Sequence, residues 1–113
     1  MAERISQCYT GNDKIEEIVV PEGVTIICDH AFDGCSSLKN ITIPNTVKKV
    51  GSYAFAKCSS LTNLCLPESV QFIGSSAFEG CSSLHTLRIP PNAVIGGPRV
   101  FAGCVSLKEL INN

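Results

Sequence analysis

The chain has 113 residues, of which 44% are hydrophobic and 17% charged, and its formal net charge at pH 7 is −1. This balance is that of one globular domain that can bury a core of its own. Interspersed charges close to neutrality create no basic field for nucleic acid, and no stretch reaches the roughly 18 apolar residues that cross a bilayer. We therefore expect neither nucleic-acid binding nor membrane insertion.

A repeat of 23 residues dominates the sequence, with about four copies from residue 18 to residue 109. Three columns recur at that step without an insertion: Phe32, Phe55, Phe78 and Phe101; Cys35, Cys58, Cys81 and Cys104; Leu38, Leu61, Leu84 and Leu107. A fixed period of roughly 20 to 50 residues is typical of solenoids, in which each repeat packs on its neighbours. We therefore predict a single repeat solenoid over residues 1–113.

The N-terminal segment 8–20 is a degenerate half-repeat. Tyr9, Gly11 and Ile15 fall on the aromatic, glycine and leucine columns of the full copies. This segment should begin the stack with half a coil, which leaves residues 1–7 outside the pattern.

Each full copy predicts the same series of elements. Residues 41–43 alternate apolar, polar and apolar side chains, as a half-buried strand does. Pro44 ends that strand because proline fixes φ and has no amide hydrogen to donate. Residues 47–50 predict a short second strand on the opposite side, and residues 54–58 predict one helical or 3-10 turn. Stacking should then create a parallel β-sheet on one face.

The fourth copy departs from this pattern between its two strands. Ala93 and Gly96 occupy columns that hold valine and isoleucine or valine in the other copies. The prolines at 90–91 and the Gly-Gly-Pro run at 96–98 indicate an altered loop of unchanged length.

The last residues, 110–113, begin a further strand. An uncovered coil exposes strand edges and apolar columns, which is a known cause of association. Leu110 and Ile111 are therefore the candidate C-terminal interface, through which the chain could associate with itself.

The repeat resembles the BspA-like leucine-rich repeats over residues 8–111. The pattern that carries this resemblance is Ala54-Phe55-x-x-Cys58-Ser59-Ser60-Leu61-x-x-Leu64-x-Leu66-Pro67-x-x-Val70-x-x-Ile73-Gly74. The resemblance implies a right-handed, gently curved solenoid with a parallel sheet along one face. It also implies kinship with surface or secreted proteins, mostly bacterial or protist, that are often linked to adhesion.

The four cysteines in register predict buried structural thiols that donate weakly to the backbone. A tetrahedral zinc site needs four ligands about 2.3 Å from one ion, and sulfur atoms spread along a solenoid cannot converge in that way. We therefore expect free thiols, no metal and no cofactor.

Candidate catalytic groups are sparse. Cys65 should point outward from its strand with Arg88 on the next coil, so a redox or nucleophilic role stands beside that of an incidental surface cysteine. His30 and His85 occupy different faces and do not pair. Because no catalytic grouping emerges, we predict that the protein is not an enzyme.

The variable outward positions of the strands are the candidate protein-contact face, because solenoids bind along their extended sheet. These positions are Lys39, Asn40, Thr42, Thr62, Asn63, Cys65, His85, Thr86 and Arg88.

Two functions follow from these features. The first is a protein-protein interaction module, such as a scaffold, an adaptor or a small subunit of an assembly, and it is favoured inside the cell because no export signal is visible and thiols are abundant. The alternative is a fragment of a BspA-like adhesion protein of the cell surface.

Overall fold

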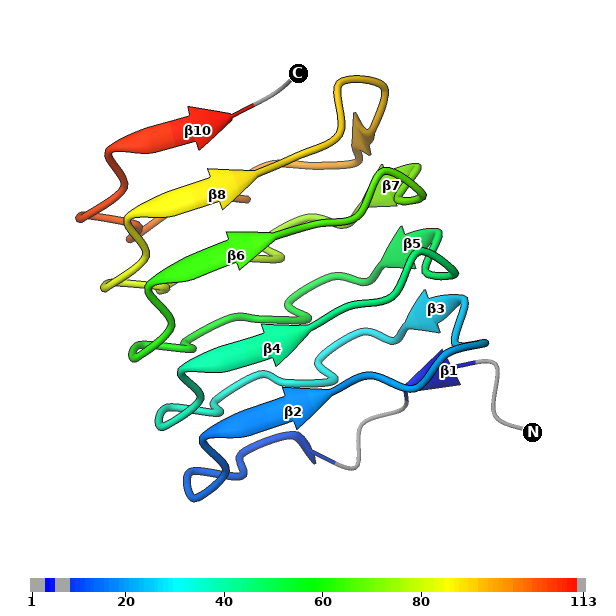
Figure 1. The fold of residues 1–113 in the computed structure, drawn as a ribbon. Coiled ribbons are helices and arrows are strands. Elements are labelled where there is room, and N and C mark those ends of the chain that lie inside the picture. The colour runs from blue at the N-terminus through cyan, green and yellow to red at the C-terminus, as the bar shows by residue number, and fades with distance from the viewer. Residues whose placement is uncertain (1–3, 6–8, 112–113) are drawn as a thin grey trace.

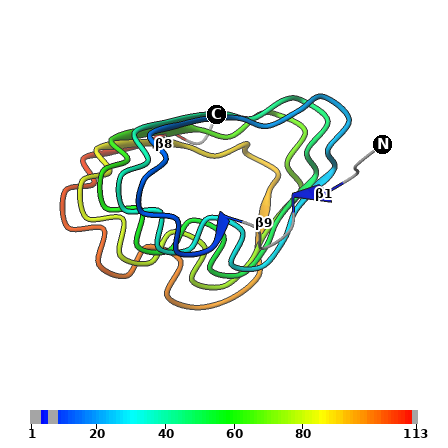
Figure 2. The same cartoon turned by 90° about the horizontal axis from the view of Figure 1, so that it is seen from below.

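The computed structural model describes residues 4–5 and 9–111, with side chains for 9–111. They form a solenoid of short parallel strands and turns (Figure 1). Viewed along the axis, successive coils lie over one another around a shared interior (Figure 2). The predicted solenoid is confirmed, and the described residues include no helix that could cross a membrane.

One side of the solenoid, the strand face, carries one three-residue strand from each coil. These strands are β2 (Glu17–Val19), β4 (Asn40–Thr42), β6 (Asn63–Cys65), β8 (Thr86–Arg88) and β10 (Glu109–Ile111). Their register places Ile18 opposite Ile41 and Leu64 opposite Leu87, so like residues stack at the inward position. The alternation of residues 41–43 predicted this arrangement.

The strand face is interrupted in the middle. β2 pairs with β4, and β6, β8 and β10 form a separate three-stranded sheet. Figure 1 shows a wider space between β4 and β6 than between the other neighbours. The expected sheet is therefore divided into two, and we call the space between β4 and β6 the seam.

The opposite side carries the shorter strands, which form one continuous five-stranded sheet. They are β1 (Arg4–Ile5), β3 (Ile26–Ile27), β5 (Lys49–Val50), β7 (Phe72–Ile73) and β9 (Val94–Ile95). β1 pairs with β3, so the expectation that residues 1–7 lie outside the pattern is wrong for Arg4 and Ile5. Two residues held by main-chain pairing leave too little side-chain pattern to be recognised. Residue 8 of the predicted half-repeat lies outside the described residues.

Stacked aromatic rings run through the core. Tyr9, Phe32, Phe55, Phe78 and Phe101 form one row, with neighbouring ring centroids 5.3 to 6.4 Å apart. The three central phenylalanines are fully buried. Such offset stacking adds to the free energy gained from burying each ring, so the coils hold one another in register.

The turns that follow the short strands have the three-residue hydrogen bonds of 3-10 turns, but no helix propagates from them. In the first coil, the amides of Ala31 and Asp33 donate to carbonyl groups three residues earlier. The amides of His30, Phe32 and Gly34 donate instead to the next coil. Because every second amide of the turn donates to a carbonyl of the next coil, each turn also links two neighbouring coils.

The fourth coil is one residue out of register at its short strand. Val50 pairs with Ile73 at a step of 23 residues, whereas Ile73 pairs with Ile95 at a step of 22. Ile95, and not Gly96, therefore takes the column predicted for Gly96. The ring of Phe72 lies 2.2 Å from where a Cβ on Gly96 would stand, so a larger residue here would have to displace that ring.

Candidate binding face

The predicted contact residues lie together on the strand face. Lys39, Asn40, Thr42, Thr62, Asn63, Cys65, His85 and Arg88 are exposed, and Thr86 is half-buried. The inward neighbours Leu64 and Leu87 are buried. Residues of consecutive coils therefore present a single surface above a fixed apolar layer, while their role in binding remains a prediction.

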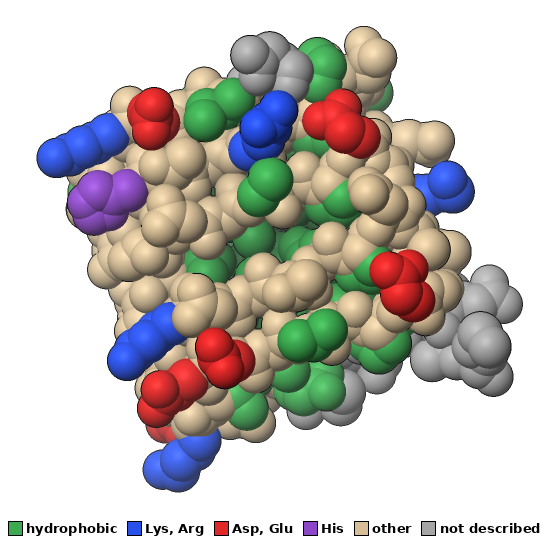
Figure 3. All heavy atoms as spheres, viewed as in Figure 1, with side chains coloured by type: hydrophobic (Ala, Val, Ile, Leu, Met, Phe, Trp, Pro, Cys, Tyr) green, Lys and Arg blue, Asp and Glu red, His purple; other side chains and the backbone are tan. Residues whose placement is uncertain are grey.

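Charge is concentrated at the edge where the strands begin (Figure 3). There, Lys39 Nζ lies 3.8 Å from Glu16 Oε1, and both side chains are largely exposed. His85 Nδ1 lies 2.9 Å from the carbonyl of Ser83. An exposed pair of this kind adds little stability, so these side chains remain available to a partner.

The middle of the face is polar and mostly uncharged. Asn63 donates to Thr62 Oγ1 at 3.3 Å, and the Thr86 hydroxyl donates to Glu109 at 3.4 Å. The register pairs Cys65 with Arg88 on neighbouring strands. Amides, hydroxyls and one guanidinium thus form a surface suited to hydrogen bonding.

The cysteine column donates to the backbone as predicted, with Cys104 only half-buried. Cys35, Cys58, Cys81 and Cys104 donate their thiols to the carbonyl groups of Tyr9, Phe32, Phe55 and Phe78 at 3.1 to 3.2 Å. Burial raises the pKa of Cys81 to about 12 and also raises the pKa of Cys58. These thiols are therefore protonated at neutral pH and serve as packing groups, and no cluster of metal-ligating side chains occurs in the described part of the chain.

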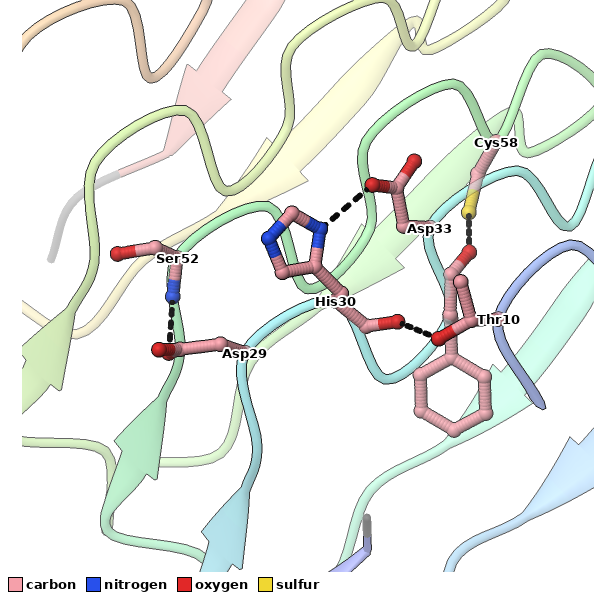
Figure 4. Close-up of polar contacts among 7 residues, drawn as sticks. Thr10, Asp29, His30, Asp33, Ser52 and Cys58 are labelled. Carbon is pink, nitrogen blue, oxygen red and sulfur yellow. Dashed lines mark hydrogen bonds and ion pairs between the residues drawn. The ribbon is translucent and has the colours of Figure 1, made fainter. Parts of the chain in front are cut away.

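His30 lies away from the strand face, in a turn (Figure 4). His30 Nδ1 lies 2.8 Å from Asp33 Oδ2, and its ring stacks on that of Tyr53 at 4.8 Å. In the same column, Arg99 binds Glu79 at 2.9 Å, and its hydrogen bond lowers the pKa of the Glu79 carboxyl. This column of side chains, which includes His30, Tyr53 and Arg99, was not predicted. The 23-residue step from His30 to Tyr53 was a signal for it.

The C-terminal coil carries much of the exposed apolar surface. Val94, Val105 and Leu110 are exposed to 58%, 83% and 49%, and Ile111 is half-buried. Leu110 and Ile111 both belong to β10, which pairs with β8. The candidate interface is therefore an ordered strand, and its role in association remains a prediction.

The chain is similar to known leucine-rich repeat proteins. The model of the BspA type leucine rich repeat region matches residues 4–113 in six copies. A leucine-rich repeat protein from Bacteroides ovatus has a TM-score of 0.81 and 34% identity, over 87% of this chain and 25% of its own. No curated protein shows significant similarity to the chain.

Two further solved structures share the fold. A leucine rich cell surface protein from Faecalibacterium prausnitzii has a TM-score of 0.63 and 26% identity, over 88% of this chain and 32% of its own. The leucine rich repeat protein of T. pallidum has a TM-score of 0.58 and 26% identity, over 95% of this chain and 70% of its own. This chain thus spans less than a third of the first two structures. With its 23-residue repeat and parallel solenoid, the chain belongs to the BspA-type leucine-rich repeat family.

Proposed function

We propose that the chain is a non-catalytic module that binds a protein partner through the strand face. One observation carries this proposal: the second outward position holds Thr42, Cys65 and Arg88 in β4, β6 and β8, and the first changes from asparagine in β4 and β6 to threonine in β8, whereas the inward positions hold isoleucine or leucine each time. The inward layer maintains the stack, and the outward side chains are free to differ according to what they bind.

The two functional hypotheses differ in where this binding occurs. The Faecalibacterium structure is described as a cell surface protein, and family membership points to the same setting. These similarities favour a part of a cell-surface binding protein over an intracellular adaptor. Cell-surface binding is therefore the function that we propose, with the adaptor as the second candidate.

Cys65 offers a direct test of the setting, because it is exposed while Cys58 and Cys81 are buried. Intact cells that express the protein would be treated with a membrane-impermeant maleimide, with Cys65→Ser as the control variant. Labelling that requires Cys65 on intact cells is the expected result. Labelling of Cys65 only after lysis would support the adaptor instead.

Charge insertion tests the face itself. The Thr42→Arg/Asn63→Arg variant would place two cations at its centre, and Lys49→Glu would change a charge on the opposite sheet as a matched control. Binding partners would be sought both among proteins found outside the cell and among the proteins of the cell's own extract. We expect the Thr42→Arg/Asn63→Arg variant to bind the partner found in this way at least about tenfold more weakly. This is the usual effect of altering a contact at the centre of an interface. Equal binding by both variants would exclude the strand face.

A further inference from the structure

The loops that leave the strand face are joined to one another by side-chain hydroxyls. Thr46 donates to the carbonyl of Val24 at 2.8 Å, and Ser69 donates to the carbonyl of Val47 at 2.6 Å. Asn92 holds the next position in this column. Among the described residues, none donates to the carbonyl of Val70. The loop of the fourth coil is therefore not joined to its neighbour in this way.

A groove of about 280 Å³ lies between these two loops, 67–71 and 90–92. The two coils keep their common step at Ala93, whose amide bonds to Pro90 as the amide of Val70 bonds to Pro67. The short strand then pairs one residue early. The shortened connection and the missing hydroxyl contact occur at the place where the groove opens.

The groove brings together hydrogen-bonding groups of both kinds. Lys48, Glu68, Gln71 and Asn92 line it. Over the part of the chain that the structure describes, none of these four side chains has a hydrogen bond or an ion pair. Side chains that donate and side chains that accept hydrogen bonds therefore line the same groove.

The remaining lining residues are Ser69, Val70, Pro90 and Pro91, so all but Ser69 are apolar. Pro90 and Val70 are buried, and Pro91 is exposed. A hydroxyl group both donates and accepts a hydrogen bond, so a ring that carries several hydroxyls can bond to partners of both kinds. The aliphatic face of such a ring would pack against the prolines.

We propose that this groove binds a neutral sugar residue. Its volume lies near the lower end of the roughly 300–1,000 Å³ of small-molecule sites, which fits one ring and not a longer ligand. Glu68 accepts from ring hydroxyls, Lys48 donates to them, and the amides of Gln71 and Asn92 do both. Because the groove lies outside the set of strand-face residues, this site is independent of the protein-binding function.

The test is an NMR titration of the isotope-labelled chain with glucose, galactose, mannose and N-acetylglucosamine in turn. We expect saturable shifts of the Gln71 and Asn92 amides with at least one sugar, at a dissociation constant on the order of 1–10 mM for so small a ligand. Glu68→Gln should weaken that binding roughly fivefold or more by removing a charged acceptor. Glu22→Gln, which changes the same column in another coil, should leave binding unchanged.

Several results would overturn the proposal. One is the absence of saturable shifts with every sugar up to about 100 mM, well above the expected range. A second is an equal effect of the Glu68 and Glu22 variants. A third is saturation by free glycine without saturation by any sugar, because it would show that Lys48 and Glu68 recognise a zwitterion instead.

Discussion

At the scale of single residues, left-handed backbone recurs in two columns of the repeat, one of which consists of His30, Tyr53, Ser76 and Arg99 and the other mostly of glycines. Gly34, Gly80 and Gly103 have φ of 83°, 80° and 76°, and Lys57 holds the same column with φ of 61°. A side chain with a Cβ costs about 1–2 kcal/mol in this conformation, whereas glycine adopts it freely. Lys57 is therefore a local weakness in the array.

Replacing Lys57 by glycine should stabilise the protein by about 1 kcal/mol, because the strain in the folded state disappears while the amide of residue 57 still donates to Glu79. Urea unfolding measures the change. The control is Lys49→Gly in β5, which should lower the stability by roughly 0.5–1 kcal/mol, since glycine is unfavourable inside a strand. A loss of stability in Lys57→Gly would show that the lysine side chain contributes more than the strain costs.

Phe55 is the residue whose truncation should be most costly, because its ring is fully buried between Phe32 and Phe78. Phe55→Ala should reduce the unfolding free energy by roughly 3–5 kcal/mol through loss of burial and the cavity that remains. Val105→Ala is the control, at a side chain that is 83% exposed, and should change it by less than about 0.5 kcal/mol. Similar effects of the two substitutions would contradict the assigned core.

At the scale of elements, the buried thiols of the cysteine column make the stability of the protein depend on pH. The folded pKa of Cys81 is about 12, above the ordinary value of 9.0, and that of Cys58 is raised in the same direction by desolvation. Above pH 9 the folded state thus holds protons that the unfolded state loses. The stability should be complete below pH 9 and fall as the pH rises toward 12.

By about pH 10, each of these two thiols should have removed roughly 1 kcal/mol of stability. Denaturant unfolding at a series of pH values tests this, with Cys58→Ala/Cys81→Ala as the reference. The variant is expected to lose less stability than the wild type between neutral and alkaline pH. Parallel curves for the two proteins would show that the thiols do not cause the decline.

The seam in the strand face gives a second prediction at this scale. The amide of Asn40 donates to the carbonyl of Glu16 on the preceding coil. The amide of Thr86 donates to the carbonyl of Thr62 in the same way. Within the described strands, the equivalent amide of Asn63 has no such bond to β4. Figure 3 shows hydrophobic side chains recessed near the middle of this face.

Hydrogen exchange should therefore be at least about tenfold faster at the Asn63 amide than at Asn40 or Thr86, because exchange follows local opening and bonding. NMR resolves the three amides within one sample, and each serves as a control for the others. Equal protection would mean that the seam is closed in solution and that the strand face is a single sheet.

At the scale of the whole molecule, stability comes from contacts between neighbouring coils, so a coil with one uncovered side leaves apolar groups exposed. Val94 and Ile95 in β9 and Leu110 in β10 are exposed apolar groups at this end of the described stack. We expect the chain to associate with itself there at high concentration. Light scattering across a concentration series should show an increase in mass that Leu110→Lys or Ile111→Lys weakens. A constant monomer mass, or an increase that these variants leave unchanged, would exclude this surface as the interface.

The architecture could be predicted from the sequence because its repeating columns follow the geometry of the coils. A 23-residue step placed the phenylalanine, cysteine and leucine columns, and the alternation of residues 41–43 identified the outward side chains of the strand face. These features follow from periodic patterns that can be read directly from the sequence. The thiol donors could be predicted for the same reason, since a recurring buried cysteine needs a nearby carbonyl.

Other features were decided only by contacts between coils. The early pairing of Ile95, the separation of β4 from β6, and the stack of His30 on Tyr53 each depend on how two distant segments settle against one another. The groove at Val70 and Asn92 lies beside the place where the short strand pairs one residue early, in a repeat of unchanged length. A one-residue shift that is later compensated preserves the sequence period, so only the tertiary structure reveals it.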